Sequence, residues 1–429
     1  MKKNVACVIN YGCQMNEYES QTVSKMLMGA GFEMSNNPDD AEVVILNTCT
    51  VRDNADLKVW HKLEHLLPQK RRSRRQKKIG LMGCMVAAQK EALMQKHPEI
   101  DFLITPAELQ SIGKVLADVT ARRFEDYSTY EVLTEGNAAV HRSYLPVQTG
   151  CNFNCTYCIV PAVKGREVNL SSVEILNKVH ELVTQGVQEI TLLGQTINSW
   201  RHEGLRFADL LARVAQKAPK IWIRFLTSHP VLFDDKILEV MRDHPNLCPW
   251  IHIPAQSGSS RVLKAMKRGY SREAYLELIL KIRETVPGVC LSTDMICGFP
   301  SETEEEFLET LSLLREVKYE TAYLFHYSER QGTVAASMEG SMPEEIRKER
   351  LARMIAVQRE VQTEIYPTFI GRTEKVLVES EAKRFDNQYK GRTSGNVPVL
   401  FQHKDNKIGS FVNVKIGEAN SQSLFGEVV

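Results

Sequence analysis

The alternation of short apolar runs with amphipathic helical patterns is the feature that most constrains how these 429 residues can fold. In the first ~135 residues, strand-like runs at 5–12, 42–48 and 78–83 are separated by segments with helical spacing, such as 17–32. Strands that alternate with helices predict a parallel sheet with helices on both faces. We therefore expect an α/β fold in which residues 1–135 form a doubly wound parallel-sheet domain.

The same pattern restarts near Ser143. Six further strand candidates lie at 143–148, 188–194, 221–226, 250–254, 289–296 and 321–327. Two of the helices between them are marked by capping boxes, Ser171 with Glu174 and Ser301 with Glu304. A closed barrel of this type has eight strands. Six strands therefore predict an open, partial (βα)6 barrel over residues 136–365.

The last part of the chain, residues 366–429, changes to short alternating runs separated by turn residues. This pattern is typical of a small β-barrel. The helical stretch 344–365 is predicted to link that module to the partial barrel.

Composition and charge limit the class of protein. The net charge is +1, so no whole-molecule field points to nucleic acid. No apolar run reaches the roughly 18 residues that cross a bilayer, and residues 1–14 are too polar for a signal peptide. We expect a cytoplasmic protein without a membrane segment, in which ten cysteines favour metal binding or catalysis over disulfides.

The most specific motif is C-x3-C-x2-C, formed by Cys151, Cys155 and Cys158 directly after the first strand of the predicted barrel. Active sites of βα barrels lie at this carboxyl edge of the strands. A structural zinc ion would need a fourth ligand, and the nearest histidine, His141, precedes the strand. Three cysteines instead favour a [4Fe–4S] cluster with one iron left open, with zinc as the alternative.

This spacing on a partial barrel resembles the radical S-adenosylmethionine (SAM) enzymes. The resemblance implies that the open iron holds SAM, whose reductive cleavage gives a 5′-deoxyadenosyl radical, and that Tyr157 is the aromatic residue usual in the motif. The polar groups that follow the other strands are expected to complete the cofactor pocket, although each could simply satisfy a loop backbone. They are Gln195, Asn198, Ser228, Gln256, Ser257 and Gly298, with His229 beside them.

A second set of cysteines lies in the N-terminal domain, where Cys13, Cys49 and Cys84 each follow a predicted strand. Ligands of open parallel sheets bind outside the carboxyl ends of the strands, so these three thiols are expected to converge. Three ligands without a fourth again indicate a cluster with an open iron. The alternative is three unrelated buried cysteines. The other four, Cys7, Cys248, Cys290 and Cys297, are expected to be structural.

Together these features resemble the radical SAM methylthiotransferases over essentially the whole chain. The strings "GCQMNEYES", "NTCTVRDNA", "GCNFNCTYCIVP", "TSHP", "QSGSSRVLKAMKRGY" and "DMICGFPSETEEEF" are similar to the branch that acts on tRNA, the MiaB group. The resemblance implies addition of a methylthio group to C2 of N6-isopentenyladenosine 37 in the tRNA anticodon loop. It assigns Cys13, Cys49 and Cys84 to an auxiliary [4Fe–4S] cluster and Cys151, Cys155 and Cys158 to the radical SAM cluster.

The resemblance also implies partners. The C-terminal module is similar to a TRAM domain, which binds RNA. An electron donor such as flavodoxin or ferredoxin and a sulfur donor are expected, and the chain is expected to be a monomer. One loop departs from the family pattern, because Ala162 and Lys164 stand where a tyrosine and an arginine are usual.

Basic residues give the candidate RNA contacts. Residues 70–78 carry seven basic side chains that could neutralise phosphates, although such a run can also be a solvated loop. Tyr389 and Phe401 are candidates for stacking on splayed bases. The expected RNA-binding set is Arg71, Arg72, Arg74, Arg75, Lys164, Arg166, Arg384 and Arg392.

Two other functions stay open at this point. The chain could be a methylthiotransferase for threonylcarbamoyladenosine in tRNA or for a ribosomal-protein aspartate. It could also be a non-catalytic RNA-binding scaffold with structural zinc.

Overall fold

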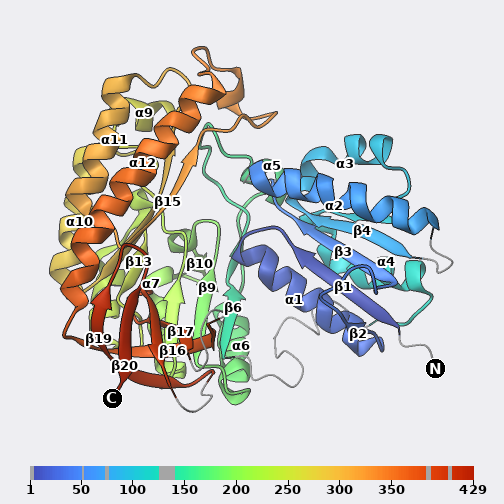
Figure 1. Cartoon of the computed structure of the whole chain (residues 1–429), viewed down its shortest axis with the longest axis horizontal. Helices are drawn as coiled ribbons and strands as arrows, with labels where there is room; N and C mark the ends of the chain where they lie inside the picture. The colour runs from blue at the N-terminus through green and yellow to red at the C-terminus, as the bar shows by residue number, and fades with distance from the viewer. Residues whose placement is uncertain (1–3, 51–52, 73–76, 125–140, 383–387, 404–407) are drawn as a thin grey trace. The chain divides into compact units, whose positions relative to one another are not determined.

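The computed structural model describes residues 4–50, 53–72, 77–124, 141–382, 388–403 and 408–429 (Figure 1). The chain divides into two compact units. The first consists of Met1–Ala138, Thr149–Phe153 and Cys158–Val168, and the second of Ala139–Gln148, Asn154–Tyr157 and Asn169–Val429. Each unit is described separately below.

The first unit is built on a five-stranded sheet in the order β2-β1-β3-β4-β5. All of its strand pairs are parallel. The strands are β1 (Val5–Asn10), β2 (Glu33–Met34), β3 (Val43–Thr48), β4 (Lys78–Gly83) and β5 (Phe102–Ile104). This confirms the predicted doubly wound sheet, in the flavodoxin-like order whose switch point lies between β1 and β3.

Helices cover both faces of this sheet. On one face α1 (Gln14–Gly29) and α4 (Ile112–Thr120) pack Val23, Met26 and Leu116 against the strands. On the other, α2 (Asp53–Arg72) and α3 (Cys84–Lys96) pack Leu63 and Leu93. The strands are apolar on both sides because both sides are buried, as expected for a parallel sheet.

The second unit contains the partial barrel, with six strands in two parallel three-stranded sheets, β12-β9-β6 and β13-β14-β15. All six predicted strands are present, which confirms the (βα)6 arrangement. The strands are β6 (Arg142–Pro146), β9 (Glu189–Leu193), β12 (Trp222–Phe225), β13 (Trp250–His252), β14 (Cys290–Cys297) and β15 (Thr321–His326). The intervening helices are α6 (Ser172–Thr184), α7 (Phe207–Lys217), α8 (Asp235–Asp243), α9 (Ser260–Ala265), α10 (Arg272–Thr285) and α11 (Glu304–Val317).

One of the two predicted capping boxes is present and the other is wrong. Ser171 caps α6 and exchanges hydrogen bonds with Glu174, as expected. At α11 the box is Thr303 with Glu306, two residues later than predicted. Ser301 has a φ of +63°, which is not the extended backbone that an N-cap residue requires.

The C-terminal module is a closed barrel in the order β16-β17-β18-β20-β19. Its strands are β16 (Thr373–Glu381), β17 (Gln388–Thr393), β18 (Pro398–Gln402), β19 (Phe411–Ala419) and β20 (Leu424–Val428), and α12 (Glu344–Ile365) precedes it. Its core is continuous with Trp250 and Cys290, the first residues of β13 and β14. The module therefore packs on the amino ends of barrel strands, away from their carboxyl ends.

A buried arginine stabilises the contact between the C-terminal module and the partial barrel. Arg224 pairs with Glu189 at 2.7 Å and donates to the carbonyls of Thr393 and Ser394 at 2.9 and 2.6 Å. Through the described parts of the chain, no helix has the length and apolarity needed to cross a membrane.

Candidate iron–sulfur and cofactor sites

The N-terminal cysteines all lie at the carboxyl edge of the first unit's sheet. Cys13 is the N-cap of α1, Cys49 directly follows β3, and Cys84 is the first residue of α3 after β4. Two of the three thiols thus stand at helix N-termini, where partial positive charge favours thiolates and anions. Cys13 and Cys49 flank the switch point of the sheet.

Glycines make the turns before two of these cysteines possible. Gly83 has a φ of +103°, and a Cβ there would lie 2.3 Å from the Thr48 carbonyl oxygen. A Cβ at Gly12 would lie 2.2 Å from Asn16 Oδ1. The repeated Gly-Cys pair therefore reflects close approach of backbone at Gly83 and of the Asn16 side chain at Gly12.

The three thiols influence one another. Burial raises the pKa of Cys84 to about 12, Lys164 opposes this, and the charges of Cys49, Glu19 and Cys13 raise the pKa further. Cys84 thus feels the charge of both other cysteines. Because iron–sulfur ligands are thiolates, cluster binding would have to displace the Cys84 proton.

Among the described residues, no three His, Cys, Asp or Glu side chains lie close enough to share one metal ion. An iron–sulfur cluster does not need such a group, because each iron takes its own cysteine. Three cysteines in each set leave a structural zinc ion one ligand short, so the donor sets fit a [4Fe–4S] cluster better than a single zinc ion.

The C-x3-C-x2-C loop is divided between the units, with Cys151 and Cys158 in the first and Cys155 in the second. In the first unit, the Cys151 amide donates to the Gly165 carbonyl at 3.2 Å. In the second, Thr156 is held by hydrogen bonds to the backbone of Ala265 and Met266, and Tyr157 packs beside Val262 and Met266.

Arg268 is the residue at this loop that the sequence analysis missed. Its guanidinium is buried and donates to Cys155 Sγ at 3.3 Å, to the Pro254 carbonyl at 3.4 Å and to the Tyr270 hydroxyl at 3.2 Å. Burial lowers the pKa of Arg268, but Tyr157, Tyr270 and Cys155 outweigh that and raise it. Only its place in the string "MKRGY" could have drawn attention to it.

Three of the predicted cofactor residues carry buried polar atoms without a hydrogen-bond partner in the described protein. They are Gln195 Oε1, Ser228 Oγ and Gln256 Oε1, which follow β9, β12 and β13. Two positive φ values accompany them, +67° at Thr227 and +70° at Gln256. Orphaned polar atoms and strained backbone are both typical of ligand sites, and these fit the polar groups of SAM.

The other three predicted cofactor residues are already used by the protein. Asn198 exchanges two hydrogen bonds with the His229 backbone, at 2.8 and 2.9 Å, and so ties two rim loops together. Ser257 Oγ accepts from the Ser259 amide and contacts Thr310. Gly298 has a φ of +72° and donates its amide to Glu302 at 2.7 Å.

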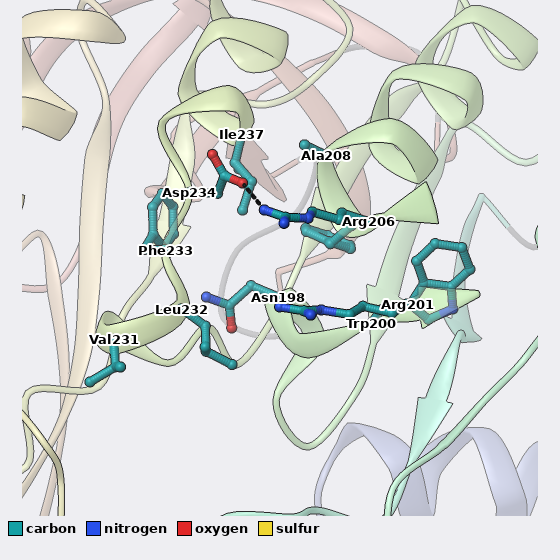
Figure 2. A pocket seen from close by; sticks show the side chains of 11 residues that line it. Asn198, Trp200, Arg201, Arg206, Ala208, Val231, Leu232, Phe233, Asp234 and Ile237 are labelled. Carbon is teal, nitrogen blue, oxygen red and sulfur yellow. Dashed lines mark ion pairs between the residues drawn. The ribbon is translucent and has the colours of Figure 1, made fainter. Parts of the chain in front are cut away.

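A cavity of about 220 Å³ lies beside this rim (Figure 2). Figure 2 shows the ion pair between Arg206 and Asp234 across it, at 3.6 Å. Of the predicted cofactor residues only Asn198 lines the cavity, so it does not coincide with the three orphaned atoms.

The predicted RNA contacts have different surroundings. Arg166 is exposed, Arg71 is 66% exposed and pairs with Glu99, and Arg392 pairs with Glu379. The Lys164 side chain is only 9% exposed and pairs with Glu19 inside the first unit, which argues against an RNA contact. Arg74, Arg75, Arg384 and the Arg72 side chain lie outside the described residues.

The prediction that two aromatic residues of the C-terminal module stack on RNA bases is wrong. Tyr389 and Phe401 are buried in the barrel core, with ring centroids 6.2 Å apart. Burial alternates along both strands, and the two rings stand at the inward positions.

Comparison with known proteins adds to this geometry. Three family models match the chain: "Uncharacterized protein family UPF0004" over residues 5–105, "Radical SAM superfamily" over 145–314 and "TRAM domain" over 367–429. Solved structures agree on the fold. A radical S-adenosylmethionine methyltransferase, TsrM from Kitasatospora setae, aligns with a TM-score of 0.58 at 13% identity, covering 78% of this chain and 77% of that one.

Similar proteins extend over nearly the full chain. Proteins named tRNA-2-methylthio-N(6)-dimethylallyladenosine synthase are 41% identical in Porphyromonas gingivalis, 42% in Parabacteroides distasonis and 38% in Chlorobium chlorochromatii. These alignments cover 97–98% of this chain and 94–96% of the relatives. The protein is therefore a radical SAM enzyme that belongs to the family of tRNA-2-methylthio-N(6)-dimethylallyladenosine synthases.

Proposed function

We propose that this enzyme adds a methylthio group to C2 of N6-isopentenyladenosine (N6-dimethylallyladenosine) at position 37 of tRNA. The end-to-end similarity of about 40% to the named synthases is the observation that carries the proposal. The orphaned polar atoms at the barrel rim and the two cysteine sets support it.

Two [4Fe–4S] clusters are part of the proposal. Cys151, Cys155 and Cys158 would hold one, and Cys13, Cys49 and Cys84 would hold the other. When bound, the clusters and SAM supply the radical and sulfur chemistry that a C–H bond of adenine requires. The protein's own groups orient SAM through Gln195, Ser228 and Gln256, while Asn198 keeps two of the rim loops in place.

The tRNA is proposed to contact the TRAM module and exposed arginines such as Arg166. The anticodon loop would present its base at the rim of the partial barrel. Flavodoxin or ferredoxin as electron donor, a separate sulfur donor, a monomeric state and a cytoplasmic location complete the proposal.

The decisive experiment is a nucleoside digest of tRNA from cells with and without the gene, analysed by mass spectrometry. Loss of 2-methylthio-N6-isopentenyladenosine, with the unmodified precursor accumulating, is expected. Loss of the methylthio form of threonylcarbamoyladenosine, or of a methylthio-aspartate on ribosomal protein, would contradict the proposal and identify the other target.

The cluster count has a separate test. After anaerobic reconstitution, about eight irons per chain are expected for two [4Fe–4S] clusters. About four irons would remove the second cluster, and zinc without iron would favour a structural role.

A further inference from the structure

A buried ion pair lies beside the three N-terminal cysteines. Lys164 Nζ is 3.0 Å from Glu19 Oε1, and the two side chains are 9% and 8% exposed. Both residues belong to the first unit. Buried ion pairs are weak evidence for stability, because apolar side chains of similar volume often serve equally well. The position of the pair suggests another role.

A continuous set of hydrogen bonds joins the pair to Cys13. The second carboxylate oxygen of Glu19 accepts from Asn16 Nδ2 at 3.3 Å. Asn16 Oδ1 in turn accepts from both the amide and the thiol of Cys13, each at 3.2 Å. Asn47 holds Asn16 through bonds of 2.9 and 2.7 Å. The orientation of the carboxylate is therefore linked to the position of one cluster ligand.

The lysine is joined to a second ligand from the other side. It ends α5 (Val160–Lys164), and Ile159 and Val163 of this segment pack against Cys84. The ammonium interacts electrostatically with both Cys84 and Cys13. The 3.0 Å contact with the Glu19 carboxylate holds Lys164 as a charged ammonium.

We propose that Lys164 is a positioning residue of the auxiliary cluster, whose charge stabilises the reduced cluster and a sulfur anion at its open iron, while Glu19 limits that charge. This inference rests on the proposed function, because it presumes that Cys13, Cys49 and Cys84 hold a cluster. A thiolate-ligated cluster gains negative charge when it is reduced or binds hydrosulfide. A cation in a low-dielectric site favours both changes, and an anion opposes them.

The test uses a background in which Cys151, Cys155 and Cys158 are replaced by alanine, so that only the auxiliary cluster remains. The midpoint potential is measured by redox titration with EPR detection, and hydrosulfide affinity by EPR. Lys164→Met is expected to lower the potential by an amount equal to about a tenfold change in the oxidised-to-reduced ratio, ~59 mV for one electron. Hydrosulfide affinity should fall about tenfold as well.

Replacing each partner of the ion pair separately gives a sharper result, because the two substitutions should change the potential in opposite directions. Glu19→Gln should raise the potential, because it leaves the ammonium without its counter-charge, and Lys164→Arg should stay near the parent value. A purely structural pair would instead give losses in the same direction for Lys164→Met and Glu19→Gln. The matched control is Lys77→Met, since Lys77 is a buried lysine of the same unit that donates to the Pro38 carbonyl at 2.6 Å.

The outcomes separate the two levels of the proposal. A parent background without iron would overturn the second cluster and this inference together. A parent cluster whose potential is unchanged by Lys164→Met and Glu19→Gln, or changed equally by Lys77→Met, would overturn only the inference. Should Lys164→Met fail to fold by circular dichroism, Glu19→Gln alone still decides, because an unchanged or lowered potential contradicts the proposal.

Discussion

The two cysteine sets differ in the charged groups that lie beside them. At the C-x3-C-x2-C loop, Arg268 donates to Cys155 at 3.3 Å, and it also donates to the uncharged Pro254 carbonyl and Tyr270 hydroxyl. At the N-terminal set, Lys164 is paired with Glu19. At the first set a cation is thus hydrogen-bonded directly to a cysteine sulfur, and at the second set the charge of the cation is compensated by a carboxylate.

This difference has a chemical consequence. Under the proposed function, the first set would hold the radical SAM cluster, and the Arg268 cation would favour its reduced form. A direct, charge-assisted hydrogen bond to a cysteine sulfur is one of the protein's means of tuning a cluster. Under the proposed function, the second set would hold a cluster that carries sulfur, and the Glu19 carboxylate would limit the field of Lys164 there. Four predictions test this comparison, from the largest effect to the smallest.

Removing each cysteine set should give different losses. Replacing Cys151, Cys155 and Cys158 by alanine is expected to abolish SAM cleavage, whereas replacing Cys13, Cys49 and Cys84 should spare it. Iron should fall from about eight to about four per chain in both variants. Iron analysis and 5′-deoxyadenosine release provide the measurements. If both variants lost cleavage equally, the two sites would not be separate.

Replacing Arg268 by methionine removes the cation at Cys155. SAM cleavage should slow at least about tenfold, and the free energy of unfolding should fall by about 2–3 kcal/mol because the Pro254 carbonyl and the Tyr270 hydroxyl lose a donor. Arg268→Lys keeps the charge and should recover part of the cluster's reduction potential. A potential that is the same in both variants would show that Arg268 acts only through packing.

The pH dependence of the free energy of unfolding should reveal the effect of the Arg268 charge on the pKa of His229. Burial, and after it the charge of Arg268, lower the pKa of His229 to about 3. The ordinary value is 6.5, so the unfolded chain binds more protons between these limits and stability falls as the pH decreases through that window. The expected loss is about 2 kcal/mol at pH 5.

The control for this effect is His229→Asn, which removes the titrating group. Urea unfolding at several pH values should show a smaller slope in this variant than in the parent. Arg268→Met should also reduce the slope, because the pKa of His229 then rises. Identical slopes in all three proteins would contradict the assignment of the acid sensitivity to His229.

The smallest effect is expected at an exposed pair of the first unit. Lys90 Nζ lies 3.2 Å from Glu108 Oε1, and both side chains are more than 40% exposed. Lys90→Ala should cost less than about 1 kcal/mol in unfolding and leave the iron content unchanged. Loss of iron here would mean that charge changes anywhere in the unit disturb the cluster, and the comparison with Lys164 would lose its meaning.

Much of the architecture could be predicted because it depends on periodicity. The alternation of strands and helices predicted both parallel-sheet parts, and the confirmed family and fold class follow the same pattern. The placement of Cys13, Cys49 and Cys84 at one edge of the sheet was predictable for a related reason, since parallel strands end at one edge. The shift of the second capping box from Ser301 to Thr303 shows the limit, because both residues have the right spacing to a glutamate.

The polar environment of the sites was far less predictable. Gln195, Ser228 and Gln256 remain good cofactor candidates, whereas Asn198 and Ser257 are used within the loops. Tyr389 and Phe401 are candidates for base stacking from the sequence, but their inward positions bury them. Whether a polar or aromatic side chain binds a ligand or packs within the protein depends on which groups surround it in the folded chain.

Spacing along the chain was therefore sufficient to recognise the strands, the two cysteine sets and the family, because these follow from local periodicity and from short motifs. The partners of those ligands come from distant segments: Lys164 meets Glu19 across 145 residues, and Arg268 meets Cys155 across 113. Such contacts depend on how separate elements pack in three dimensions, and no local pattern in the chain encodes them.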